Sequence, residues 1–180
     1  EGQRTCKKRS YRRESYFDEQ SQTSKNYYIP YIKEVIGHIP DKVLEVGCGE
    51  GGNLLPFAEA GCRVMGVDID ATRIEQARTF FAQRHQQGQF IATDIFQLKD
   101  KATNFPLILL HDVIEHIRDK ERFFSGLQEH LSADGAVFVG FPAWQMPFGR
   151  PPADIAPSCH ISFHISLFST SFPALYTDGY

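Results

Sequence analysis

The feature that most constrains the fold is a short apolar segment that runs straight into a glycine-rich turn. Residues 43–46 read Val-Leu-Glu-Val, glycines follow at 47, 49, 51 and 52, and residues 53–60 resemble a helix. Glycine has no Cβ, so a ligand can approach the backbone of such a turn closely. The start of the following helix offers unpaired N–H groups and the positive end of a dipole. A strand, a glycine turn and a helix in this order predict a ligand site.

Apolar segments and helical patterns alternate along the following residues. Helical spacing of apolar residues covers 70–84 and continues from 119 to about 131, and further apolar segments occupy 62–67, 89–92, 106–110 and 136–141. Such alternation predicts an α/β fold, with a Rossmann-like, doubly wound and mostly parallel sheet. The segment 106–110 is wholly apolar, so we expect it at the centre of the sheet.

The residues before the first strand divide into two parts. Residues 1–26 are polar and basic, and we expect a solvated arm or frayed helix there, with a patch for an anionic partner as the alternative. Residues 27–38 predict a helix over the sheet edge or over a ligand cleft, interrupted early by Pro30. The shared face of that helix would consist of Tyr28, Ile32, Val35 and Ile36.

The composition excludes several classes of protein. A chain of 180 residues suffices for one domain with a core. Its net charge of −3 does not demand nucleic acid or an acidic membrane surface, and no apolar stretch approaches the ~20 residues of a membrane span. We expect a cytoplasmic protein, since its cysteines lack paired or metal-type spacing and suit reduced thiols; they are Cys6, Cys48, Cys62 and Cys159.

The predicted strands end in acidic or titratable residues, which are Glu45, Asp68, Asp94, and His111 with Asp112. Parallel strands present their carboxyl ends along one edge of a sheet, where ligands of such folds bind. We therefore expect these side chains to lie in a row.

The glycine turn fits two adenosine cofactors. Glycines 47, 49 and 52, with Asp68 about twenty residues on, also match a dinucleotide site such as that for NAD. Three features favour S-adenosylmethionine. Glu45 suits a cationic tail better than a pyrophosphate, Asp94 could accept an adenine amino hydrogen, and about forty residues precede the first strand.

Four segments carry a resemblance to a known family. They are 45–51 (Glu-x-Gly-x-Gly-x-Gly), 66–69 (Gly-Val-Asp-Ile), 93–95 (Thr-Asp-Ile) and 112–117 (Asp-Val-Ile-Glu-His-Ile). In this order, at these strand ends, they resemble the motifs of class I S-adenosylmethionine-dependent methyltransferases. Within that superfamily they are most similar to the small-molecule branch that includes ubiquinone-biosynthesis-type O-methyltransferases. The resemblance covers roughly residues 30–150.

The resemblance implies a role for each matching residue. Glu45 would act on the ammonium of the cofactor's methionine end, directly or through water, and Asp68 would take both ribose hydroxyls. Asp94 would receive the adenine amino group, and His111 would approach the methionine part. The backbone cradle would consist of Gly47, Cys48, Gly49 and Gly51, and the residues beside the adenine would be Ile69 and Ile95. Both isoleucines could equally be core residues.

The catalytic candidates are His111, Asp112 and His116. Asp112 would face the methyl-transfer cavity, and either histidine could be the base for a hydroxyl acceptor. With Glu115 these residues have spacings that could suit a metal, but we expect none, because a catalytic site needs a specific third donor. Cys48 is expected to be a small turn residue rather than a nucleophile.

These inferences predict a methyltransferase that uses S-adenosylmethionine, yields S-adenosylhomocysteine and methylates an O or N atom of a small-molecule acceptor. The alternatives are an inactive cofactor-binding protein or partner subunit and, ranked last, an NAD-dependent oxidoreductase. The cofactor-binding domain would span 27–150. Residues 151–180 depart from the family pattern and suggest a truncated or frameshifted tail. One strand is evident within 160–168, so the sequence leaves open whether both C-terminal strands of a complete methyltransferase sheet form.

Overall fold

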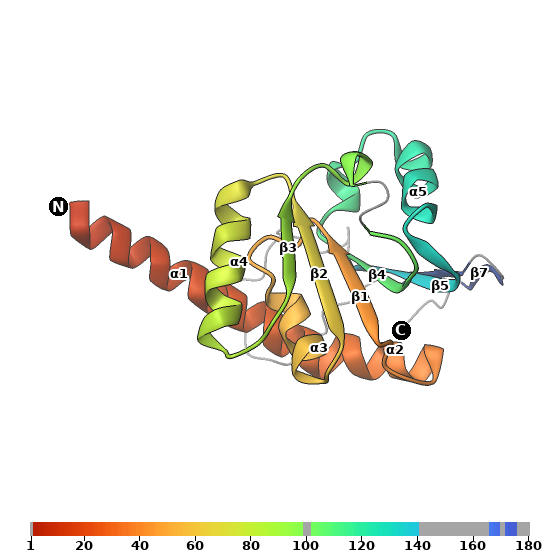
Figure 1. Ribbon diagram of the computed structural model, residues 1–180, viewed down its shortest axis with the longest axis horizontal. Helices are drawn as coiled ribbons and strands as arrows, with labels where there is room; N and C mark the ends of the chain where they lie inside the picture. The colour runs from red at the N-terminus through yellow and green to blue at the C-terminus, as the bar shows by residue number, and fades with distance from the viewer. Residues whose placement is uncertain (1, 99–101, 141–165, 170–171, 176–180) are drawn as a thin grey trace, which may run out of the picture.

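The computed structural model describes residues 2–98, 102–140, 166–169 and 172–175, with side chains for 13–98 and 102–140. One sheet with the order β3-β2-β1-β4-β5-β6-β7 organises the chain. The strands β1 to β5 pair in parallel, and β6 and β7 are antiparallel additions at one edge (Figure 1). The expected doubly wound, mostly parallel sheet is therefore confirmed. The strands are β1 (Lys42–Val46), β2 (Arg63–Asp68), β3 (Gln89–Ala92), β4 (Phe105–His111), β5 (Leu131–Gly140), β6 (Ser166–Ser169) and β7 (Phe172–Leu175).

The strand β4 lies between β1 and β5, as its apolar sequence predicted. Strand β5 begins earlier than expected, at Leu131, which the sequence pattern had assigned to the preceding helix. Asp134 and Gly135 were expected to turn into this strand. Instead they lie inside it, where the β4–β5 register shifts between Phe105 and Leu107. Asp134 and Gly135 therefore do mark an irregular backbone, but it is a register shift within the strand and not a turn before it.

Two short strands follow residues 141–165, which lie outside the described part of the chain. Strand β6 pairs with β5 and falls partly within the segment where one strand was expected. Strand β7 pairs with β6 and was not evident from the sequence. Within 151–180 the structure describes only these two strands, so the hypothesis of a truncated or frameshifted tail lies mostly outside the described residues.

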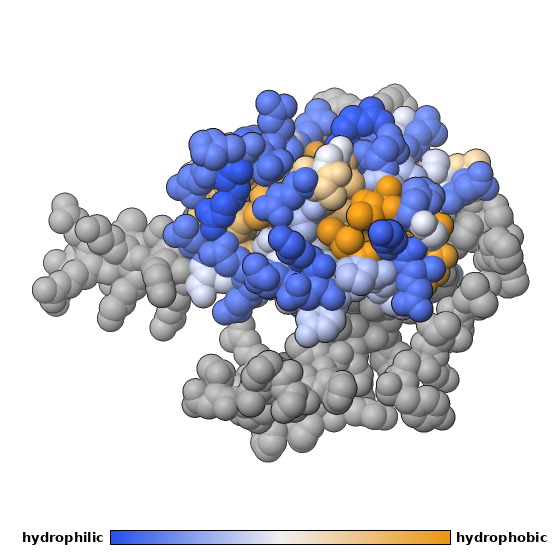
Figure 2. Space-filling view, turned by 90° about the horizontal axis from the view of Figure 1, so that it is seen from below, coloured by the Kyte–Doolittle hydropathy of each residue, from blue (hydrophilic) through white to orange (hydrophobic). Residues whose placement is uncertain are grey.

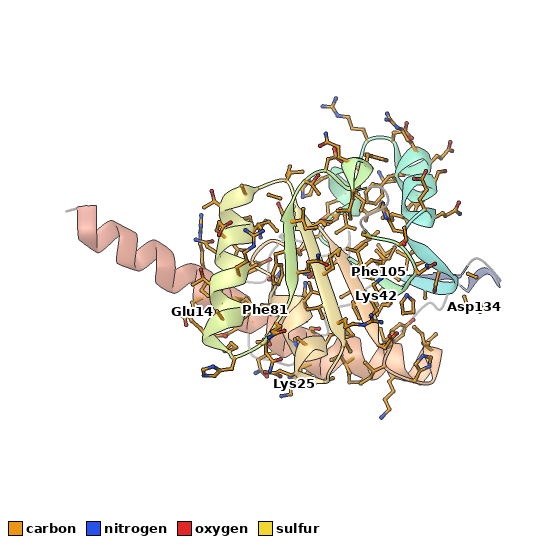
Figure 3. All side chains as sticks on the ribbon, in the orientation of Figure 1. Glu14, Lys25, Lys42, Phe81, Phe105 and Asp134 are labelled. Atoms are coloured by element: carbon orange, nitrogen blue, oxygen red, sulfur yellow. The ribbon has the colours of Figure 1, made fainter. Side chains whose placement is uncertain are left out.

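Two hydrophobic clusters pack on the two sides of the sheet. One contains Phe81 of α4 (Ala71–Gln83), together with apolar residues of the N-terminal helices and of α3 (Leu55–Glu59). The other contains Phe105, together with residues of η3 (Ile95–Gln97) and α5 (Lys120–Gln128). Figure 3 labels Phe81 and Phe105, one from each cluster. The N-caps expected at Asp70 and Asp119 are confirmed, since each side chain accepts a backbone N–H of its helix.

The N-terminal helices are α1 (Gly2–Thr23), η1 (Ser24–Tyr28) and α2 (Ile29–Ile36). Helix η1 is a π-helical turn, in which the Ile29 N–H donates to the Ser24 carbonyl. Pro30 follows and has no N–H to donate to the preceding turn, which is a setting that favours such widening. Ile32 is fully buried as expected, but the prediction for Val35 is wrong, since 48% of that residue is exposed.

The end of α1 packs against the glycine turn (Figure 1). Phe17 is fully buried, and a Cβ added to Gly52 would lie 2.6 Å from the Phe17 carbonyl oxygen. The buried Ser24 hydroxyl donates a hydrogen bond of 2.8 Å to the Asn53 carbonyl. The second half of the segment predicted as a solvated arm or frayed helix therefore contributes to the core and packs against the glycine turn.

One face of the described chain is mainly polar. Figure 2 shows hydrophilic side chains over most of one face, with hydrophobic residues gathered toward its middle. Among the described residues, no helix combines the length and the apolar character that crossing a membrane requires.

Candidate functional site

The glycine turn after β1 is tight and closely surrounded. Gly47, Gly49 and Gly51 all have positive φ, at 72°, 54° and 82°. The Gly47 N–H donates to the Val67 carbonyl at 2.8 Å, which ties the turn to β2. A Cβ on Gly47 would lie 2.5 Å from Cγ2 of Val113. Both the backbone conformation and the available space therefore require glycine at position 47.

Asp68, at the end of β2, organises the turn. Its Oδ2 accepts the Gly49 N–H at 2.8 Å, and its Oδ1 accepts the Asp70 N–H at 2.8 Å. The residue is only 8% exposed, yet it borders a cavity. Each carboxylate oxygen has a further lone pair, so Asp68 can hold the turn and still accept hydrogen bonds from a ligand.

Glu45 is a buried carboxyl group with an unused acceptor. The amide Nδ2 of Asn53 donates to its Oε1 at 2.8 Å, whereas Oε2 has no hydrogen-bond partner among the described residues. Burial, and secondarily the neighbouring Asp68, raises the pKa of Glu45 to about 8, against the effect of the Asn53 hydrogen bond. An unsatisfied buried oxygen of this kind needs an explanation, and a cationic ligand group supplies one.

A cavity of about 540 Å³ opens beyond the carboxyl ends of the parallel strands. That volume lies within the range of small-molecule sites. The predicted site residues that line it are Gly47, Asp68, Ile69, Asp94, Ile95, Asp112 and His116. The other predicted site residues adjoin the lining from the turn and from the ends of β1 and β4 without forming part of it; they are Glu45, Cys48, Gly49, Gly51 and His111.

The walls of the cavity include unusually exposed apolar side chains. Ile69 is 82% exposed and Phe96 is 40% exposed, whereas Ile95 is buried at 7% and belongs to the core beneath. The Asp94 carboxylate accepts the Phe96 N–H at 3.0 Å as the N-cap of η3. Exposed apolar side chains beside an acceptor suit a flat heteroaromatic ring with an amino group.

Phe96 was not predicted from the sequence. The guanidinium of Arg122 lies 5.1 Å from the centroid of its ring, and the ring lies so near Gly126 that a Cβ there would come within 2.9 Å of it. Its place directly after a strand end and an N-cap is a signal that could have identified it.

An ion pair that the sequence did not reveal crosses the glycine turn. The Arg73 side chain donates from Nε and Nη2 to Oε2 of Glu50, at 3.1 and 2.8 Å, and its Nη1 lies 4.0 Å from Oδ2 of Asp68. Glu50 is buried, and Arg73 lines the cavity. A Cβ on Gly49 would collide with this guanidinium, so the turn packs closely against the Arg73 side chain of α4.

The three catalytic candidates have different surroundings. His111 contacts Tyr28 Oη through Nδ1 at 2.9 Å and Asp112 Oδ2 through Nε2 at 3.3 Å. Burial lowers the pKa of His111, against the effect of Asp112 and Glu115. His116, in η5 (Ile114–His116), is exposed and lines the cavity.

Cys48 is 2% exposed, and burial raises the pKa of its thiol well above the usual value, which suits a small turn residue. Within the described side chains, no three His, Cys, Asp or Glu residues converge as metal ligands would.

Comparison with known proteins identifies the family. A family model described as "Methyltransferase domain" matches residues 44–137. The ubiquinone biosynthesis O-methyltransferase of Bartonella quintana is 35% identical over 98 residues, which are 54% of this chain and 40% of that protein. Its counterpart from Brucella ovis is 34% identical over the same lengths. This chain thus spans about 40% of the length of these curated relatives.

Solved structures share the fold. PKMT2 from Rickettsia typhi in complex with AdoHcy aligns with a TM-score of 0.58 and 27% identity, over 68% of this chain and 26% of that chain. The PH0226 protein from Pyrococcus horikoshii OT3 aligns with a TM-score of 0.57 and 27% identity, over 63% and 54%. Because the family model covers more than half of the residues and the sheet agrees with it, the chain belongs to the methyltransferase domain family and has the class I methyltransferase fold.

Proposed function

We propose that this protein binds S-adenosylmethionine along the carboxyl edge of its sheet and transfers the methyl group to an oxygen or nitrogen atom of a small-molecule acceptor. The observation that carries the proposal is the cavity beyond β1, β2 and β4, in which Asp68, Asp94 and the glycine turn meet. The family match supports methyl transfer over hydride transfer to NAD.

The residues of the site fit this cofactor. Among the described residues Oε2 of Glu45 has no partner, which suits the ammonium of the methionine end, and the further lone pairs of Asp68 suit ribose hydroxyls. Asp94, Ile69 and Phe96 together offer an acceptor and apolar faces to an adenine. The Gly47 turn provides the close backbone approach that such a ligand needs.

When bound, the cofactor supplies a methyl group activated on a sulfonium. The protein's own contribution is to orient the acceptor, to exclude water and to accept a proton. His116 is the proposed base for a hydroxyl acceptor, because its imidazole is exposed at the cavity. An amine acceptor can react from its neutral form without that base. The names of the curated relatives support oxygen as the acceptor atom.

Asp112 lines the same cavity from the loop after β4, and we propose that it faces the acceptor. We propose a reducing compartment, the cytoplasm, as its location, because Cys48 and Cys62 are both free and buried.

Isothermal titration with S-adenosylmethionine tests the proposal. We expect micromolar binding that is lost in Asp68→Ala and retained in Asp41→Ala. Asp41 is the matched control, since it forms an exposed ion pair with Arg63 at the amino ends of β1 and β2, away from the cavity. Tighter binding of NAD would contradict the proposal. Binding of S-adenosylmethionine without transfer to any phenol, catechol or amine in an acceptor library would instead support the cofactor-binding protein without activity.

A further inference from the structure

A chain of three side chains connects the N-terminal helices to the cavity. Tyr28 Oη lies 2.9 Å from Nδ1 of His111, and Nε2 of the same ring lies 3.3 Å from Oδ2 of Asp112. Tyr28 is 1% exposed and the His111 side chain 13%, whereas the Asp112 side chain is 41% exposed and lines the cavity. These three side chains therefore form a continuous series of contacts from the core to the cavity.

The chemistry of the two ends determines where the protons lie. An ionised Asp112 carboxylate can only accept, so the His111 nitrogen that faces it, Nε2, must carry the hydrogen. A neutral imidazole has one N–H, which leaves a lone pair on Nδ1. Tyr28 must then donate its hydroxyl hydrogen to Nδ1. The opposite tautomer would place the lone pair of Nε2 against the negative charge of Asp112.

We propose that Tyr28 fixes His111 in its Nε2–H form, so that His111 positions Asp112 at the cavity and does not act as the catalytic base. In this arrangement Nε2 already carries a hydrogen, and Nδ1 can accept a proton from an acceptor hydroxyl only by losing the hydrogen bond from Tyr28. Base catalysis then falls to His116. Only this assignment of catalytic roles rests on the proposed function; the tautomer of His111 does not.

The surrounding charges are consistent with a neutral ring. Burial lowers the pKa of His111, whereas Asp112 and Glu115 on the following loop oppose that shift. Burial, reinforced by Glu45 on β1 and by Asp112, raises the pKa of Tyr28, and Tyr16 on α1 adds to this shift. Tyr28 therefore keeps its hydrogen and remains a donor across the physiological range.

Asp112 is held in an unusual backbone conformation. Its φ is 51°, in the left-handed region that non-glycine residues rarely adopt. Its N–H donates to the Gly140 carbonyl at 3.0 Å. A Cβ on Gly140 would lie 3.3 Å from Nδ1 of His111, so the ring is also confined from β5. The backbone hydrogen bond and the 3.3 Å contact with Nε2 of His111 together hold the Asp112 carboxylate at the cavity that it lines.

Long-range 1H–15N NMR spectra of the 180-residue chain test the tautomer without any cofactor. The chain has seven histidines, and the signals of His111 are those lost in His111→Gln. We expect a neutral Nε2–H ring at His111 between pH 6 and 8. In Tyr28→Phe the ring should show mixed tautomers or take up a proton in that range. The matched control is Tyr27→Phe, because Tyr27 is the adjacent residue and is 60% exposed.

Two NMR outcomes would overturn the proposal. One is an Nδ1–H or doubly protonated His111 at neutral pH. The other is a His111 ring whose tautomer is the same in Tyr28→Phe as in the parent chain.

Transfer rates then test the positioning role. Gln places an amide nitrogen where Nε2 of His111 lies, whereas Asn places one near Nδ1. We expect His111→Gln to transfer methyl groups about tenfold faster than His111→Asn, which is the rate equivalent of one hydrogen bond. Equal rates for these two variants, with cofactor affinity intact, would refute the role of His111 while leaving the proposed function in place. If the unaltered chain does not bind S-adenosylmethionine, the proposed function is contradicted, but the assignment of the His111 tautomer still stands.

Discussion

The two ends of the same parallel strands are built differently. At the amino end, Lys42 of β1 lies 3.9 Å from the centroid of the Phe105 ring and donates to the Thr103 carbonyl at 2.7 Å (Figure 3). At the carboxyl end, Glu45 of the same strand is buried, and one of its oxygens lacks a hydrogen-bond partner within the part of the chain that the structure describes. Three positions along one strand thus separate a lysine whose partners lie in the chain from a buried carboxyl group that has one oxygen without a partner among the described residues.

This difference indicates which end binds a ligand. Polar groups that are satisfied within the chain stabilise the fold, whereas buried polar groups that lack a partner indicate an external one. The carboxyl end also holds the positive-φ residues Gly47, Gly49 and Asp112, together with the exposed Ile69. The following predictions test whether the two ends can be altered independently.

The largest effect is expected from Gly47→Ala. The new methyl group would meet Val113 at 2.5 Å, and the φ of 72° disfavours alanine. We expect a loss of about 2–4 kcal/mol in the free energy of unfolding and loss of S-adenosylmethionine binding. Gly61→Ala is the control, since its φ of 89° carries the same backbone penalty but no described atom lies within 4 Å of the new methyl group. Equal losses in the two variants would show that the close approach of Val113 is unimportant.

The next effect concerns the protonation of Glu45. Because the pKa in the folded state is raised to about 8, the folded protein retains a proton that the unfolded chain loses near pH 4.5. The free energy of unfolding should therefore fall as the pH rises from about 4.5 to about 8, and Glu45→Gln should remove that slope. Chemical denaturation at a series of pH values measures it. A Glu45→Gln slope that matches the parent chain would assign the pH dependence to another group.

Cofactor binding should reverse that protonation. An ammonium beside Oε2 favours the ionised carboxylate, so binding at pH 7 should release about one proton from Glu45. Titrations in two buffers with different ionisation enthalpies measure the release. Proton release that persists in Glu45→Gln would contradict the contact between Glu45 and the ammonium.

A smaller effect is expected from Ile69→Ala. Since Ile69 is 82% exposed, its truncation should change the free energy of unfolding by less than about 0.5 kcal/mol. Burial against an adenine should nevertheless make it worth about tenfold in S-adenosylmethionine affinity. Val35→Ala is the control, because Val35 is also exposed but lies outside the cavity lining. An unchanged dissociation constant for Ile69→Ala would remove this residue from the site.

The smallest effect on binding is expected from Lys42→Met at the amino end. The change retains most of the side-chain stem while removing the contact with Phe105 and the hydrogen bond to Thr103. We expect a loss of about 1 kcal/mol in the free energy of unfolding and no change in cofactor affinity. A change in affinity would show that the two ends of the sheet are coupled.

The sequence predicted those features that depend on short-range patterns. Strands, the N-caps at Asp70 and Asp119, and the glycine turn each follow from a few neighbouring residues, and the row of acidic strand ends then follows from parallel topology. The start of strand β5 was predicted too late in the sequence. Asp134 and Gly135 are typical of a turn, but the same residues also occur at an irregularity inside a strand, and the sequence alone does not distinguish the two.

Contacts between distant segments could not be predicted in this way. Tyr28 and His111 lie 83 positions apart, and Glu50 and Arg73 lie 23 apart. Neither pair forms a local motif, since each depends on how a helix packs over the sheet. The sequence therefore identified the groups at the carboxyl edge but not the second layer of residues that orients them.

The π-helical turn at Ser24–Tyr28 has a consequence for anyone who edits this protein. One residue more or fewer in a helix rotates everything beyond it by about 100°. The widened turn holds one residue more than an α-helical turn, so a deletion inside it could be absorbed by a return to α-helix. A deletion between Phe17 and Ser24 has no such turn to absorb it and would swing the Tyr28 phenol away from the imidazole it faces, with no catalytic amino acid replaced. The count of residues between Phe17 and Tyr28, more than their chemical identity, is what a designer of shortened or grafted versions must preserve.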